Sequence, residues 1–206
     1  MKVFWELLTV RHFVAGLLAF AIYHFIEPFI CLWLGEGYLL DREILVLLVV
    51  NIYINSSRGA VDMFNFSHGL FADVWAAWTE LALNVGITLV AGYYWGIAGI
   101  LLGKTVSMTL IIVFWKPYYL FRDGLHESYA SYWGGALRNY LVSLASMLAA
   151  HFALPLFGID AYANLGSWCL FCAAGLGVYL AANLTLTMLF CPGANGLLDR
   201  LKRQKH

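Results

Sequence analysis

Five charged side chains lie inside otherwise apolar stretches of the sequence, where ionised groups are rare. They are Arg58 and Asp62, in the segment NSSRGAVDMF, together with Glu27, Glu80 and Lys104. On insertion scales an ionised side chain at the centre of a bilayer costs ~2.5–3.5 kcal/mol, so such groups usually face a protein interior or a watery cavity. These five residues are therefore the candidate functional residues of the chain.

Arg58 and Asp62 are four residues apart, which places them one turn apart on a helix. One interpretation is a neutralised pair near the membrane surface, with the guanidinium of Arg58 reaching toward water. The other is that Arg58 faces the interior of a helix bundle and binds an anionic ligand. The spacing is compatible with both interpretations.

Lys104 is expected close to the midplane of its apolar stretch, too deep for its ammonium group to reach the surface easily. We therefore expect either a buried carboxylate partner, with Glu27 and Glu80 as candidates, or an anionic ligand. Glu27 precedes Pro28, which removes a backbone hydrogen bond and tends to kink a helix.

Composition predicts the elements that position these residues. Of the 206 residues, 62% are hydrophobic and 12% are charged, and the mean hydropathy is +0.76. Apolar stretches of the length that a membrane-spanning helix needs occur at approximately 12–34, 43–65, 75–94, 96–115, 136–157 and 164–190. The sequence thus predicts an all-α, polytopic membrane helix bundle with about six transmembrane helices, forming a single domain over residues 1–206.

The basic residues predict how this bundle is oriented. Nine of the twelve lysines and arginines lie before the first stretch, between the fourth and fifth, or after the sixth. Because positively charged segments stay in the cytoplasm, both termini are expected there, with 191–206 as a basic cytoplasmic tail. The aromatic connection over 116–135 is expected along the inner membrane interface. The formal net charge of zero argues against a nucleic-acid partner.

Four segments resemble a known family. They are EPFICLWLGEGYLL (27–40), NSSRGAVDMFNFSHGLFADVWAAWTELALN (55–84), WGIAGILLGKTVS (95–107) and WKPYYLFRDG (115–124). In order and spacing they look like the later half of bacterial polysaccharide-biosynthesis proteins of the Wzx oligosaccharide-flippase type. That superfamily also contains multidrug and toxic-compound extrusion transporters and the lipid II flippase. The resemblance covers roughly residues 5–145.

The resemblance implies a transporter, not an enzyme, that moves polyprenyl-diphosphate-linked oligosaccharide for O-antigen, capsule or exopolysaccharide assembly. Such transporters lie in the bacterial inner membrane and have two lobes around a central cavity. They work by alternating access, with a proton or sodium gradient as the driving force and no bound cofactor or metal. Arg58 and Lys104 would bind the headgroup, while Glu27, Asp62 and Glu80 would compensate charge or couple transport.

The same resemblance implies that the chain corresponds to the C-terminal part of such a transporter. A partner lobe, or a homodimer of this chain, would then complete it. Two other classes remain open at this point. One is a membrane scaffold of a polysaccharide locus that does not transport. The other is an intramembrane enzyme acting on lipid-linked sugar, for which Asp62, His68, Asp73 and Glu80 are the candidate groups.

Overall fold

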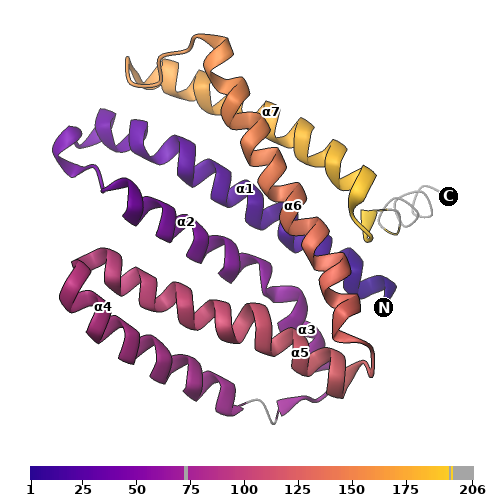
Figure 1. Ribbon diagram of the computed structural model, residues 1–206. Helices are drawn as coiled ribbons and strands as arrows, with labels where there is room; N and C mark the ends of the chain where they lie inside the picture. The colour runs from indigo at the N-terminus through magenta and orange to yellow at the C-terminus, as the bar shows by residue number, and fades with distance from the viewer. Residues whose placement is uncertain (72–73, 195, 197–206) are drawn as a thin grey trace.

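The computed structural model describes residues 1–71, 74–194 and 196, and every regular element in these ranges is a helix (Figure 1). The α-helices are α1 (Lys2–Trp33), α2 (Arg42–Ser57), α3 (Gly59–Ser67), α4 (Val74–Met108), α5 (Lys116–Tyr119), α6 (Tyr129–Ala153) and α7 (Leu165–Phe190). The shorter elements are the 3-10 helices η1 (Glu36–Tyr38) and η5 (Leu154–Phe157) and the π-helices η3 (Thr109–Trp115) and η4 (Leu120–Gly124). The predicted all-α class is confirmed for the described residues.

Five helical segments are long and apolar enough to cross a membrane. They are Lys2–Trp33, Arg42–Ser67, Val74–Gly124, Tyr129–Phe157 and Leu165–Phe190. Many of their large apolar side chains point away from the bundle; Leu89, for example, is 70% exposed. A soluble monomer rarely exposes so much contiguous apolar surface, so the five segments indicate a membrane-embedded protein.

The third segment is a helical hairpin, because α4 folds back on itself at Gly96 (Figure 1). Gly96 has φ 57° and ψ −131°, a conformation open essentially to glycine alone. The two limbs approach closely, since a Cβ on Gly99 would collide with the backbone carbonyl of Ala91. The hydroxyl of Thr88 also donates to the carbonyl of Ile100 across the hairpin, at 3.3 Å. The predicted separation of two apolar stretches near residue 95 corresponds to this reversal.

The bundle has two distinct ends (Figure 1). The loop end carries the connection over 34–41, the reversal at Gly96 and the connection over 158–164. The terminal end carries the N-terminus, α3, α5 and the last turn of α7. Among the described residues, the N-terminus and the helical connection after α4, both expected at the cytoplasmic face, therefore gather at one end.

Helix α1 is central and packs against α2, α6 and α7. Close packing with α7 depends on Gly16, because a Cβ there would collide with the hydroxyl of Tyr179. Tyr179 is fully buried, and its hydroxyl accepts a hydrogen bond of 2.6 Å from the amide of Asn183. Small residues and paired polar groups are the usual means by which membrane helices associate. The α4 hairpin instead packs against α2, so one side of it lies at the edge of the bundle.

Two of the predicted boundaries are wrong. The connection over 116–135, expected as a short helix or two, is mostly helical, but it is not separate from the apolar stretches on either side. The chain continues through η3, α5 and η4 to Gly124, and α6 already begins at Tyr129. Proline removes one backbone hydrogen bond, and the π-helices on either side of Pro117 accommodate it without ending the helix. Helix α1 begins at Lys2 instead of near residue 12, since Phe4 and Leu8 are buried in the core.

Candidate functional site

The centre of the candidate site is the carboxylate of Asp62, which two basic side chains share at the terminal end. The Nε of Arg58 lies 3.2 Å from Oδ2 of Asp62, and the Nζ of Lys116 donates to Oδ1 at 2.7 Å. Arg58 stands at the junction of α2 and α3, Asp62 lies in the first turn of α3, and Lys116 begins α5. The predicted pairing of Arg58 with Asp62 is thus present, and a second cation joins it.

A third basic residue, Arg11 of α1, lies beside this cluster. A Cβ on Gly59 would be 3.0 Å from the Cζ of Arg11, so the missing side chain makes room for the guanidinium. The Asp62 side chain is 17% exposed and that of Arg58 is 37% exposed. The Asp62 side chain is therefore more sheltered than that of Arg58.

Asp62 also lines a cavity of about 180 Å³ between α3, α4 and α5. Its polar lining residues are Asp62, Asn65, Glu80 and Lys116, and its apolar lining residues are Phe66, Leu70, Phe71, Val74 and Ala77. Glu80 comes from the first limb of α4, so three separate elements contribute polar groups. The cavity thus brings together two of the residues selected from the sequence, Asp62 and Glu80.

Asn65 gives this cavity its clearest chemical preference. The side chain is only 7% exposed, and its Oδ1 atom has no hydrogen-bond partner. An unpaired buried acceptor costs about 1–3 kcal/mol, which a donor would recover if the side chain turned toward the cavity. With Lys116 as a donor and Glu80 as a further acceptor, the cavity suits a ligand that carries hydroxyl groups beside an anionic group.

Lys104 and Glu27 are not part of this cluster. The Lys104 side chain is exposed on α4, and within the described residues no ion pair to it is found. The expected pairing of Lys104 with Glu27 or Glu80 is therefore wrong for the described residues, while the alternative of an anionic ligand stays a prediction. Glu27 instead lies near the loop end, with its Oε2 atom 3.6 Å from Nη1 of Arg42. The physical reason is the orientation of the hairpin, whose second limb turns Lys104 away from α1.

Sequence reasoning missed Lys116, Asn65 and Arg11. For Asn65 a signal was present, because positions 58, 62 and 65 fall on one face of a helix. Lys116 was expected in an interfacial connection, where a lysine indicates only the topology of the chain. The basic residues of the predicted tail, Arg200, Lys202, Arg203 and Lys205, lie outside the described residues, as does Asp73. His68 is described but does not line the cavity.

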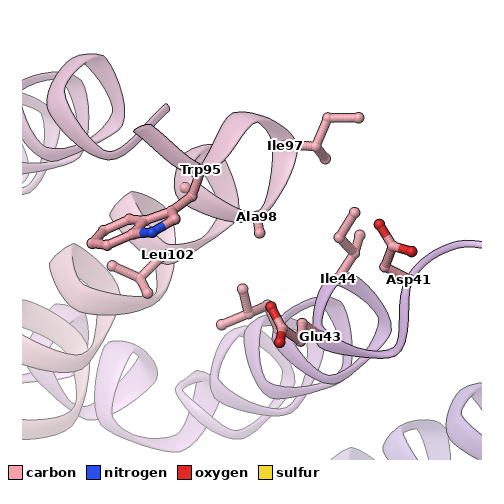
Figure 2. Close-up of a pocket in the computed structure, with 9 residues that line it drawn as sticks. Asp41, Glu43, Ile44, Trp95, Ile97, Ala98 and Leu102 are labelled. Atoms are coloured by element: carbon pink, nitrogen blue, oxygen red, sulfur yellow. The ribbon is translucent and has the colours of Figure 1, made fainter. Parts of the chain in front are cut away.

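A second cavity, of about 480 Å³, lies at the loop end between the start of α2 and the hairpin reversal (Figure 2). Figure 2 shows the carboxylates of Asp41 and Glu43 at the start of α2, across the cavity from Trp95, Ile97 and Ala98. None of the five residues selected from the sequence lines it. Because its charged lining is acidic, an anionic ligand is favoured at the terminal end instead.

Comparisons of the chain with protein-family models, curated proteins and solved structures found no match, so the geometry of the site and the sequence pattern carry the functional interpretation.

Proposed function

We propose that this chain is one lobe of a transporter that moves a polyprenyl-diphosphate-linked oligosaccharide across the bacterial inner membrane by alternating access. The observation that carries the proposal is the Asp62 carboxylate held between Arg58 and Lys116 beside a polar cavity. Arg58 and Lys116 contact Asp62, the Arg11 guanidinium lies beside Gly59, and Glu80 lines the cavity, so three cationic groups and two carboxylates lie in this region. The net formal charge of these groups is positive, which suits a diphosphate group at the depth of the lipid headgroups.

The geometry supports a simple mode of binding. Diphosphate oxygens would replace Asp62 as the acceptors for Arg58, whose guanidinium is the more exposed partner of that ion pair. Asp62 would then keep its hydrogen bond to Lys116. Hydroxyl groups of the first sugar would donate to the unpaired Oδ1 of Asn65 and to Glu80. The proposed headgroup role of Arg58 thus extends to Lys116 and Asn65.

The proposed topology has six crossings, with each limb of the α4 hairpin crossing once. At about 1.5 Å per residue, the limbs over 74–95 and 97–124 are about 33 Å and about 42 Å long. Both lengths exceed the roughly 30 Å of a bilayer core. The basic loops and the first residues of the chain favour a cytoplasmic terminal end. The proposed site would therefore receive its lipid-linked substrate from the cytoplasmic leaflet.

A partner lobe is part of the proposal. Lys104 is exposed on α4, where a second lobe or a second copy of this chain would supply a compensating carboxylate. The two lobes would enclose the headgroup between them. A proton or sodium gradient would drive the alternation.

Lipid binding to the purified protein in nanodiscs tests the proposal. The probe is a polyprenyl diphosphate carrying one N-acetylhexosamine, compared with the polyprenol of the same length, and binding is measured by native mass spectrometry. We expect the diphosphate lipid to bind and Arg58→Ala to weaken it about 10- to 100-fold, the loss of one hydrogen bond to a charged group. The affinity of Arg58→Lys for this lipid should lie between those of the wild type and Arg58→Ala, because lysine keeps the charge but lacks the planar guanidinium.

Arg122→Ala is the matched control. Arg122 is a second arginine near the terminal end, where it contacts Asp123 and Tyr118 and does not line the cavity. We expect its binding to stay within about twofold of the wild type. Equal losses in both variants, or unchanged binding in correctly folded Arg58→Ala, would contradict the proposed site. Movement of the labelled lipid between leaflets of proteoliposomes then tests transport separately.

A further inference from the structure

A pair of histidines joins α1 to α6 near the loop end, far along the bundle from the candidate site. The Nε2 atom of His24 lies 3.1 Å from the Nδ1 atom of His151. Both rings line a cavity of about 380 Å³, which we call the histidine cavity. Its other lining residues are Leu154, Pro155, Gly158, Ile159, Asp160 and Phe171. Nothing in the proposed transport site uses this pair.

The hydrogen-bond partners determine which nitrogen holds which proton. The Nδ1 atom of His24 lies 3.2 Å from the backbone carbonyl of Phe20. A carbonyl oxygen only accepts, so Nδ1 of His24 carries the hydrogen, and its Nε2 is the lone-pair acceptor of a neutral ring. It follows that Nδ1–H of His151 donates to Nε2 of His24. The lone pair of His151 is therefore on Nε2, and His151 is the exposed member of the pair.

We propose that His151, held by His24, is a proton-binding site that opens on the histidine cavity. One proton from water adds to Nε2 of His151, so the ring gains one positive charge and no bond to His24 is lost. The existing N–H···N hydrogen bond becomes charge-assisted and therefore stronger. His24 is a positioning residue, because the Phe20 carbonyl fixes the tautomer that accepts from His151.

The neutral pair can accept one additional proton, on His151, and it disfavours a second, on His24. A proton on Nε2 of His24 would place two N–H groups against each other, so the bond between α1 and α6 would be lost. The guanidinium of Arg42 also opposes a second charge, because it donates to the hydroxyl of Tyr23, whose ring lies 4.9 Å from that of His24.

The titratable and charged groups around the pair come from four segments. They are Tyr23 and Glu27 on α1, Arg42 on α2, Asp160 and Tyr162 on the connection before α7, and Cys172 and Tyr179 on α7. Glu27 lies 3.6 Å from Arg42, so its carboxylate offsets part of the Arg42 charge near the histidines. Asp160 is the carboxylate that lines the histidine cavity.

Proton occupancy would therefore control how firmly α1 and α6 are joined at the loop end. An occupied site has a charge-assisted bond, and an empty site has a neutral one. In a transporter this would link the proton concentration on the loop side to closure of that end. This last step rests on the proposed function, whereas the proton site itself does not.

Nitrogen NMR on the protein labelled with ¹⁵N-histidine in nanodiscs tests the site. We expect a scalar coupling across the N–H···N bond at about pH 8, assigned with His24→Gln and His151→Gln. As the pH falls, Nε2 of His151 should become protonated first, while the coupling persists and the His24 ring remains neutral. His24→Phe should weaken proton binding at His151 about tenfold, because the imidazolium loses its acceptor.

His126→Asn is the matched control, since His126 is an exposed histidine on the short connection before α6. It should leave the titration of His151 unchanged. Protonation of His24 before His151, an absent coupling, or unchanged proton binding in correctly folded His24→Phe would overturn the inference. The measurement uses no lipid-linked substrate, so its outcome is independent of whether the chain transports one.

Discussion

The ammonium group of Lys116 lies 2.7 Å from Oδ1 of Asp62, which joins the start of α5 to the first turn of α3. These residues are far apart in the sequence, yet both side chains are mostly shielded, at 22% and 17% exposed. Arg58 occupies the other oxygen of the same carboxylate. Asp62 is thus the residue through which α2, α3 and α5 are tied together at the terminal end.

The first prediction concerns the stability of this link. Asp62→Asn should lower the free energy of unfolding by about 1–3 kcal/mol, because Lys116 loses its charged acceptor while remaining largely shielded. Unfolding in mixed micelles with increasing dodecyl sulfate measures the change. Asp123→Asn is the control, since Asp123 is more exposed and its contact with Arg122 is longer, at 3.7 Å; it should change stability by less than about 0.5 kcal/mol.

The double variant Asp62→Asn with Lys116→Met sharpens this test. It should recover part of the lost stability, because no shielded ammonium is then left unpaired. If the effects of the two substitutions are strictly additive, the pair makes no specific contribution to stability.

A second prediction follows from the exposed position of Lys104. Lys104→Met should change the stability of the protein in detergent by less than about 0.5 kcal/mol, since the side chain is exposed and makes no ion pair within the described residues. In double-mutant cycles that combine Lys104→Met with Glu27→Gln or with Glu80→Gln, the changes in stability should be additive. A coupling larger than about 0.5 kcal/mol in either cycle would show a Lys104–carboxylate interaction that the structure does not contain.

The third prediction concerns the hairpin reversal. Gly96→Ala should destabilise the protein by about 1–3 kcal/mol, because the backbone conformation there disfavours a side chain. Gly103→Ala should also destabilise, since the added Cβ would collide with Thr88 on the opposite limb. Unfolding in dodecyl sulfate again provides the measurement.

Gly86→Ala is the internal control for the hairpin. Gly86 lies within the first limb of α4, and a Cβ there would meet no atom within 4 Å. It should be neutral or stabilise by about 0.5–1 kcal/mol, the helix preference for alanine over glycine. An equal loss of stability in Gly86→Ala and Gly96→Ala would show that the reversal is not the cause.

The fourth prediction concerns topology. In a variant without native cysteines, a cysteine at Asp160 and a cysteine at Glu127 should react with membrane-impermeant maleimide from opposite sides of the membrane. Asp160 belongs to the connection at the loop end, and Glu127 to the short connection that joins η4 to α6 at the terminal end. Labelling of both positions from one side would contradict the arrangement of the helices across the bilayer.

The long apolar stretches of the sequence were enough to predict an all-helical protein with membrane-spanning helices. An apolar run of sufficient length has to form a helix in lipid, because only then are its backbone groups hydrogen-bonded within the segment. The Arg58–Asp62 pair was likewise predictable, since a spacing of four residues brings two side chains together on any helix.

Tertiary structure alone decided which charges meet. A helix that is apolar all round gives no sequence signal for the face it turns inward, so the outward position of Lys104 depended on how the hairpin packs on α2. Lys116 reaches Asp62 because π-helices carry the chain past Pro117 as a continuation of α4, where a separate short helix along the interface was expected. Likewise, packing of α1 against α6 aligned His24 with His151, because side chains so distant in sequence meet only where rigid helices fix their relative rotation and depth.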